Sequence, residues 1–414
     1  MKVATGLAIG KSALPELAAQ AVTMAMEKAE ITQPTSVLLF LTSEFAADPQ
    51  SAIKAAAKAA SCTQIIGCSA TGIFTEEDWV IDSPAAAAMV FTKLNFSHPK
   101  AGEKNNDLLL TLTAPNAINT TWLNPTGFNP TGFNPDVLKQ ANGRFGGVSG
   151  DAIGHGPFSV WQNGKGTTQG YCEVSFNNTV MAVAASHGLK IISSPRKVTA
   201  AEGNDLLKVA SQPALATLTS AWQKHAKTTD TPPYHQLMAV YASKSSQLER
   251  GEYSLASIII ENVDEDSVTL TKSLQVGDWL SWAIRDVDAA QVDIVKTAGK
   301  LKQQLGTEPA FALLFSCLGR GPYFYNGTDQ DLALLKTLFP KLPIIGFYGN
   351  GEIAPINGIN ELLQYSAVLG LFAESKLSVI LLKSAMQMTH SWSIDVVQPW
   401  ILSISTRLPC LSVR

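Results

Sequence analysis

Two distant stretches of this sequence follow the same order of segments, and this duplication limits the folds open to the chain. In each copy an apolar run is followed by a helix-like spacer, then by Ile-Ile-Gly with a second glycine five residues on, then by another apolar run. Continuous apolar runs that alternate with helices are typical of buried strands in an α/β fold. The runs lie at 36–40, 65–72 and 85–91 in the first copy and at 311–315, 344–351 and 366–372 in the second.

The duplication predicts an α/β fold with two related halves built from matching helix–strand units. Apolar spacing of three and four residues predicts helices at 12–30, 48–60, 201–224 and 289–305. Between 144 and 194, short β-prone segments are separated by turn residues such as Asn163-Gly164, which predicts an antiparallel β meander. Two such halves are expected to face each other across a cleft, where small molecules bind.

A chain of 414 residues exceeds what one hydrophobic core usually organises, so two domains are expected. We place the first domain at 1–205 and the second at 206–383, followed by an irregular tail at 384–414. Residues 124–135 repeat Asn-Pro-Thr-Gly-Phe in tandem. Proline and glycine at this density cannot continue a helix or a strand, so this segment is expected to be a loop insertion.

Composition excludes several classes of partner. The chain is 46% hydrophobic and 16% charged, and its net charge of −3 comes without any basic stripe, so no nucleic-acid partner is expected. Its apolar runs are strand-sized and shorter than the ~20 residues of a membrane-spanning helix, so no membrane insertion is expected. The five cysteines are odd in number and form no Cys-x-x-Cys pair. They indicate reduced thiols, and therefore a cytoplasmic protein.

No convincing catalytic constellation is visible, so the chain is not expected to be an enzyme. Three residues separate Gly6 from Gly10 ahead of Lys11-Ser12, whereas a phosphate loop needs four. The six histidines show no metal-binding spacing, and no cofactor or metal is expected. The enzymatic alternative is a hydrolase or transferase that uses Cys317 or Ser69 as its nucleophile.

Polar residues follow the predicted parallel strands, on the loops where α/β sheets bind ligands. Arg320 lies between two glycines, so its backbone and guanidinium can approach one anion together. Glu352 follows Gly-Asn-Gly and can receive an ammonium group. This chemistry suits a zwitterion, which makes an amino acid or similar small molecule the expected ligand. The candidate ligand-binding residues are Ser69, Thr71, Asp151, Cys317, Arg320, Tyr348, Asn350 and Glu352.

A structural interpretation of Arg320 and Glu352 is equally open. The two side chains can pair with each other and hold two loops together, since loop ion pairs are common and often contribute little. An Arg320→Ala variant separates the interpretations. It abolishes binding with an almost unchanged melting temperature if Arg320 contacts a ligand, and it loses stability if Arg320 belongs to an ion pair.

Several motifs carry a family resemblance. IGCSATG (66–72), GGVSGD (146–151), HGL (187–189) and VTAAEGN (198–204) resemble the N-terminal part of the FIST sensory domain. CLGRG (317–321) and IGFYGNGEI (345–353) resemble its C-terminal part. The resemblance covers roughly residues 30 to 375, and the last two motifs together are fairly specific.

The resemblance implies a small-ligand sensor in signal transduction, with amino acids as the proposed ligands. In many family members the sensor is fused to a kinase, cyclase or chemoreceptor output module, and no such module is visible in this sequence. The expectation is therefore a stand-alone sensor that acts through a signalling protein partner. A further alternative is an interaction scaffold that binds no ligand.

Overall fold

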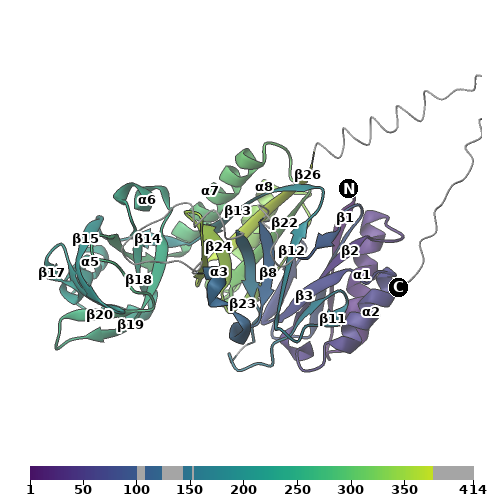
Figure 1. Ribbon diagram of the computed structural model, residues 1–414, viewed down its shortest axis with the longest axis horizontal. Helices are drawn as coiled ribbons and strands as arrows, with labels where there is room; N and C mark the ends of the chain where they lie inside the picture. Colours follow the sequence, from purple (N-terminus) through teal and green to yellow (C-terminus); the bar gives the residue numbers. More distant parts are fainter. Residues whose placement is uncertain (100–107, 124–142, 152, 376–414) are drawn as a thin grey trace, which may run out of the picture. The chain divides into compact units, whose positions relative to one another are not determined.

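The structure is a computed structural model that describes residues 1–99, 108–123, 143–151 and 153–375. The predicted insertion at 124–135 and the predicted tail at 384–414 lie outside the described residues. In the described part, the first copy of the duplication forms one unit (Figure 1). It consists of β1 (Val3–Ile9), α1 (Pro15–Ala29), β2 (Ser36–Thr42), α2 (Gln50–Ala60), β3 (Ile65–Ala70), β4 (Gly72–Thr75), β5 (Trp79–Ile81) and β6 (Ala85–Phe91).

The second copy repeats this order of elements. It consists of β13 (Thr179–Ser186), α7 (Val287–Leu305), β22 (Phe311–Cys317), α8 (Gln330–Leu338), β23 (Ile344–Gly349), β24 (Glu352–Ile356), β25 (Ile359–Leu363) and β26 (Ala367–Glu374). The strand order is β1-β6-β2-β3 in the first unit and β13-β26-β22-β23 in the second. The parallel neighbours are β2 and β3 in the first unit and β22 and β23 in the second, and the other neighbouring strands in this order are antiparallel. The predicted duplication of α/β units is confirmed.

Matching glycines allow the parallel strands of each unit to approach closely. A Cβ atom on Gly67 would lie 1.7 Å from the carbonyl oxygen of Leu39, and one on Gly346 would lie 1.8 Å from that of Leu314. No side chain fits at such distances, so each Ile-Ile-Gly motif needs its glycine for the same physical reason.

The two units pack with their sheets face to face and their helices outside. Helices α1 and α2 cover one sheet, and α7 and α8 cover the other. The inner faces of both sheets meet in the main core. There, Phe40 of β2 and Phe315 of β22 lie with ring centroids 6.4 Å apart. The registers of β2 and β22 against β6 and β26 place these two residues at equivalent positions, so the duplication brings equivalent aromatic rings together.

Strands of the two sequence halves share sheets. The hairpin β4–β5 extends the second unit, because β4 pairs with β23. Likewise, β24 pairs with β9 (Arg144–Val148), within a sheet of order β25-β24-β9-β8-β12-β7. The remaining elements of this middle segment are β7 (Phe96–Ser97), β8 (Leu109–Thr113), α3 (Thr120–Leu123), β10 (Val160–Gln162), β11 (Lys165–Gly166) and β12 (Tyr171–Phe176).

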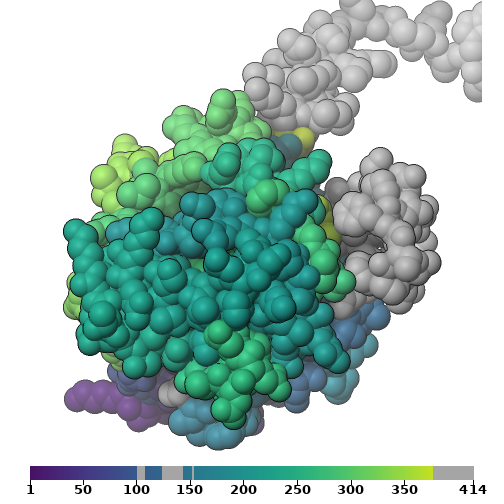
Figure 2. Space-filling model, turned by 90° about the vertical axis from the view of Figure 1, so that its left-hand side faces the viewer, coloured from purple at the N-terminus to yellow at the C-terminus, as the bar shows by residue number. Residues whose placement is uncertain are grey.

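An inserted segment separates β13 from α7 and forms a small barrel of its own. Its strands pair antiparallel, and a ring closes because β18 pairs with both β19 and β21. Figure 2 shows the face of the molecule to which this segment contributes, in teal and green. The elements are β14 (Leu189–Ile191), β15 (Arg196–Glu202), β16 (Asp205–Val209), β17 (Gln212–Pro213), α5 (Ala214–Ala226), β18 (Leu237–Ala242), α6 (Ser245–Arg250), β19 (Ser254–Asn262), β20 (Ser267–Leu270) and β21 (Trp279–Arg285).

The helices predicted at 12–30, 48–60 and 289–305 are confirmed, but the helix at 201–224 is wrong over its first half. That part forms β15 and β16, joined by a turn at Gly203, whose φ of +55° favours glycine. Of the strands in the segment 144–194, β10, β12, β13 and β14 pair antiparallel as expected, but with partners in several sheets, whereas β9 pairs parallel with β8. No helix of the described residues is long and apolar enough to cross a membrane.

Candidate functional site

The ends of β22 and β23 bring several of the predicted site residues together. Cys317 is the last residue of β22, and its backbone N–H donates to the carbonyl of Ser366, 3.0 Å away. Glu352 begins β24, three residues after β23 ends. Burial, and next the neighbouring Glu352, raise the pKa of the Cys317 thiol to about 12, and the cation of Arg285 opposes them. Cys317 therefore lies within electrostatic reach of both an acid and a guanidinium.

Glu352 is the most unusual side chain at these strand ends. It is 0% exposed, and neither carboxyl oxygen has a hydrogen-bond partner within the described residues. Burial raises the pKa of its carboxyl well above the ordinary value. The backbone of Ser366 is close enough to oppose this shift, but it does not meet the geometry of a hydrogen bond to either carboxyl oxygen. The registers of β3 and β23 align Ala70 with Gly349. Three residues further along each copy, Ile73 of the first unit corresponds in sequence to Glu352, so an apolar core residue there matches an acid here.

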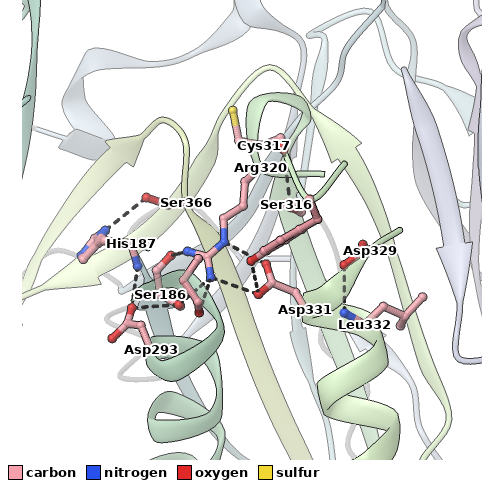
Figure 3. Close-up of polar contacts among 12 residues, drawn as sticks. Ser186, His187, Asp293, Ser316, Cys317, Arg320, Asp329, Asp331, Leu332 and Ser366 are labelled. Carbon is pink, nitrogen blue, oxygen red and sulfur yellow. Dashed lines mark hydrogen bonds and ion pairs between the residues drawn. The ribbon is translucent and has the colours of Figure 1, made fainter. Parts of the chain in front are cut away.

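Arg320 is 1% exposed and contacts groups of the chain itself (Figure 3). Its Nε donates to Asp331 Oδ2 at 2.8 Å and its Nη2 to Asp331 Oδ1 at 3.1 Å, a two-pronged ion pair. Its Nη1 donates to the carbonyl of Ser186 at 2.6 Å, and its Nη2 also reaches the carbonyl of Ala290 at 3.3 Å. Arg320 therefore forms a structural ion pair, as the alternative interpretation expected, but its partner is Asp331 and not Glu352.

Tyr348 belongs to the same buried network. Its hydroxyl donates to Asp329, which in turn accepts the backbone N–H of Leu332 at 2.9 Å and so caps α8. Burial, together with the nearby Asp331, raises the pKa of Asp329 to about 6. Tyr325 donates to Asp331 at 2.8 Å. Tyr348 and Arg320 thus fix the loop after β22 against α8, directly behind the strand ends.

The loop after β9 lies against Thr71 and Asn350. A Cβ atom on Gly150 would lie 2.7 Å from Thr71 Oγ1 and 3.1 Å from Asn350 Oδ1, so both side chains border this glycine. Thr71 Oγ1 is buried and has no hydrogen-bond partner within the described part of the chain. The hydroxyl of Thr71 is therefore a second polar group whose hydrogen-bonding capacity is unused.

Ser69 and Asp151 are occupied by local contacts. Ser149 Oγ donates to the carbonyl of Ser69 at 2.5 Å, and the backbone N–H of Ser159 donates to Ser69 Oγ at 3.0 Å. Asp151 accepts the backbone N–H groups of Gly154 at 2.6 Å and Gly156 at 2.9 Å. These side chains shape the loops that border the strand ends.

Three surface hollows, around Asn177, Gln303 and Pro340, contain none of the eight predicted residues. Glu352 is fully buried, and Thr71 and Cys317 are nearly so, so a ligand would reach these side chains only when the surrounding loops open. No group of three or more potential metal ligands occurs among the described residues.

Sequence reasoning missed the residues that complete this cluster. Asp331 lies inside α8, and Ser186 and His187 lie at the end of β13, far from the strand-end motifs in sequence. His187 Nδ1 lies 3.1 Å from Ser366 Oγ, and its ring stacks on Tyr253 at 5.1 Å. The HGL motif was a signal for His187, but nothing in the sequence indicated Asp331.

Comparison with known proteins agrees with this architecture. The FIST N domain model matches residues 35–211 and the FIST C domain model matches residues 218–355. An uncharacterized protein of Mycobacterium bovis is 25% identical over 231 residues, which is 55% of this chain and 60% of the relative. An uncharacterized protein of Mycobacterium tuberculosis H37Rv is 24% identical over 236 residues, again 55% of this chain and 60% of the relative. The chain thus aligns with somewhat less than two thirds of these relatives. Because the two domain models together span most of the described residues, the chain belongs to the FIST family, whose domains are sensory domains of signal transduction.

Proposed function

We propose that this chain is a cytoplasmic small-ligand sensor that binds an amino acid or a similar zwitterion at the strand ends of the second unit. The observation that carries the proposal is Glu352, a fully buried carboxyl without a hydrogen-bond partner among the described residues. Leaving such a group unsatisfied costs about 1–3 kcal/mol. The first unit avoids that cost with Ile73, so retention of an acid in the second unit supports a role in binding.

A ligand ammonium group would complete the hydrogen bonding of Glu352. A buried carboxyl that is neutral in the empty protein becomes charged when a cation lies beside it, because an opposite charge favours the ionised form. Asn350 and the unused hydroxyl of Thr71 supply further hydrogen bonds on the side of Gly150. Cys317, 8% exposed, ends the neighbouring strand β22.

The other predicted residues position the loops that border the proposed site. Ser69 and Asp151 hold the bordering loops, and Arg320 and Tyr348 hold the loop after β22 against α8. Opening of these loops admits the ligand, and a signalling protein partner would read the resulting shift between closed and open populations.

A thermal-shift screen of the twenty amino acids, their amines and related small carboxylates tests the proposal. Binding stabilises the folded state by mass action, and a ligand at 100 times its Kd adds about 2.7 kcal/mol. The Glu352→Gln variant keeps a neutral side chain of similar shape but cannot become an anion, so we expect it to lose the shift. Glu16→Gln, at an exposed helix position, is the matched control. A screen in which no compound shifts the wild type would favour an interaction scaffold.

The enzymatic alternative uses Cys317 or Ser69 as its nucleophile, and the pKa of the Cys317 thiol gives a direct test of the first of these. A nucleophilic cysteine requires a depressed pKa, whereas burial raises this one to about 12. We therefore expect iodoacetamide to label the half-buried Cys62 before Cys317 at neutral pH, as followed by peptide mass spectrometry. Rapid labelling of Cys317 would favour the hydrolase or transferase.

A further inference from the structure

Arg285 is the last residue of β21, and its guanidinium lies next to the candidate site. Its Nη2 donates to the carbonyl of Gly319, in the loop that follows Cys317. The guanidinium carbon lies 4.2 Å from the ring centroid of Tyr365 and 5.1 Å from that of Phe324. Two aromatic rings therefore fix the orientation of this half-buried cation.

The two arginines near the strand ends differ in how their donors are used. The donors of Arg320 point at Asp331, Ser186 and Ala290. Among the described residues, Arg285 makes one hydrogen bond, to Gly319, and forms no ion pair with a carboxylate. A guanidinium carries five N–H donors in a planar fork, so most of those on Arg285 are left for another acceptor. A half-buried guanidinium that has no anionic partner in the described part of the chain is suited to bind a planar anion such as a carboxylate.

The backbone around Arg285 is shaped to hold the aromatic ring against it. Tyr365 has a φ of +54°, a left-handed conformation that costs energy for a residue other than glycine. Its ring lies so close to Gly319 that a Cβ atom there would be 2.7 Å from Tyr365 Cδ1. Gly319 thus leaves room for the ring, and the strained Tyr365 completes one wall beside the guanidinium.

Arg285 and Glu352 both lie near Cys317. Arg285 donates to Gly319, two residues after Cys317. Glu352 lies opposite Leu363 in the β24–β25 pair, three residues before Ser366, whose carbonyl accepts the backbone N–H of Cys317. The acid raises the pKa of the thiol and the guanidinium lowers it, which agrees with this arrangement. In Figure 3 the sulfur of Cys317 points away from the buried side chain of Arg320. A cation and an unsatisfied acid near one thiol supply the two complementary ends that a zwitterion needs.

We propose that Arg285 is the residue that binds the carboxylate of the ligand, in the role that the sequence suggested for Arg320. The ligand class is then a small molecule with a planar carboxylate for Arg285 and an amine for Glu352. This inference rests on the proposed function, which it deepens by naming the anion partner at the same site.

Matched sets of compounds test the assignment by thermal shift. L-leucine, 3-methylbutylamine and 4-methylpentanoate share the isobutyl side chain but carry both charged ends, the amine alone and the carboxylate alone, respectively. L-phenylalanine, 2-phenylethylamine and 3-phenylpropanoate form a second set. Each compound is titrated against the wild type, Arg285→Gln, Arg285→Lys and the control Arg196→Gln, an exposed arginine of the barrel.

We expect Arg285→Gln to bind the amino acid of the active set about ten- to a hundredfold more weakly, because it loses charged hydrogen bonds. The amine-only compound should bind the wild type and Arg285→Gln equally. Arg285→Lys keeps the charge without the planar fork, so it should recover only part of the affinity, and it serves if Arg285→Gln fails to fold. Arg196→Gln should bind like the wild type.

The failures of the two proposals are distinguishable. If amino acids bind and Arg285→Gln retains wild-type affinity, the assignment of Arg285 is wrong and the sensor function stands. The assignment is also overturned if the amine-only compounds bind as tightly as the amino acids. If no compound shifts the wild type, the proposed function fails and the role of Arg285 fails with it.

Discussion

The two α/β units share a backbone but differ in what they bury at equivalent positions. The first unit carries small or apolar side chains, and the second carries a polar network. The differences lie at the end of the edge strand, in the short helical turn after the central strand, and at the parallel-strand end. The equivalent pairs are Ala8 and Ser186, Ile9 and His187, Thr42 and Cys317, Phe45 and Arg320, Ser69 and Tyr348, and Ile73 and Glu352.

This comparison separates the tasks of the two units. Ile9 is 53% exposed, whereas its equivalent His187 is 4% exposed beneath Tyr253. Both units must keep the packing of their backbones, but the side chains at the strand ends can differ between them. The second unit accepts buried polar groups that lower its stability, which is a common trade-off at functional sites. The second unit is therefore the one in which substitutions should reveal function.

The largest expected effect comes from breaking the buried ion pair of the second unit. Arg320→Met leaves Asp331 buried without its cation, which should lower the free energy of unfolding by about 3–5 kcal/mol. Urea unfolding measures the change. The double variant Arg320→Met/Asp331→Leu makes the position apolar, as Phe45 makes it in the first unit, and should recover most of the loss. An unchanged stability combined with lost binding would instead return Arg320 to the role of a ligand contact.

The next effect is the pH dependence contributed by His187. Burial lowers the pKa of its imidazole to about 4; Asp293 and Glu361 oppose this shift, and Arg320 and Lys272 add to it. The folded state therefore binds fewer protons than the unfolded state between pH 4 and 6.5. The stability tied to neutral His187 is present above the unfolded pKa and disappears as the pH falls toward 4, by up to about 3 kcal/mol.

His187→Asn removes this titration, so its stability relative to the wild type should improve as the pH falls from 7 to 4.5. Urea unfolding of both proteins at these two pH values gives the comparison. Ile9→Asn, the matched change at the exposed equivalent position, should show no such pH-dependent difference. A difference between His187→Asn and the wild type that stays constant with pH would mean that the histidine titrates normally.

The sequence pattern predicted the repeated backbone well because buried strands and their glycines leave a local signal. Gly67 and Gly346 are needed at identical close approaches, and the apolar runs around them match buried strands. The helix at 201–224 was mispredicted because the apolar residues of β15 and β16 also fit helical spacing, while Gly203 marked a turn. The division into two domains at residue 205 stays a prediction. Strands from both sides of this residue pair within the same sheets.

The candidate site was only partly predictable, since a strand-end motif shows which loop carries a side chain but not what the side chain meets. Arg320 and Glu352 follow neighbouring strands, yet the arginine turns toward Asp331 in α8. That choice depends on how α8 packs against β22, which no local pattern encodes. Arg285 was missed for a similar reason, because the barrel between β13 and α7 carries it to Gly319 through tertiary structure.

A smaller effect is expected when the second unit is made to resemble the first at its unsatisfied acid. Glu352→Ile introduces the residue found at position 73, and should raise the free energy of unfolding by about 1–3 kcal/mol at neutral pH. Because the folded pKa of Glu352 is raised, the wild type loses stability as the pH rises above the unfolded value near 4.5. The gain of the variant should therefore grow from pH 4.5 to pH 8.

Urea unfolding across this pH range measures the gain, and the thermal-shift screen should show that ligand binding is lost. Ile73→Val is the matched variant of the first unit, and it should lose about 0.5–1.5 kcal/mol at every pH. A destabilised Glu352→Ile protein would mean that the carboxyl already makes a favourable interaction in the empty protein. That result would remove the main support for a ligand at this position.

The smallest effect is expected at the end of β22, where the equivalent residues of the two units, Thr42 and Cys317, are similar in size. Thr42 accepts the backbone N–H of Ala85 at 2.9 Å, and the backbone of Ser366 occupies the equivalent position beside Cys317. Cys317→Thr should therefore change the free energy of unfolding by less than about 1 kcal/mol, since the new hydroxyl can make the hydrogen bond of the first unit. Its amino acid binding, measured by the same thermal shift, should stay within a few fold of the wild type. Complete loss of binding, or of a hydrolytic activity found in the wild type, would make the thiol essential and would favour the enzymatic alternative over a sensor.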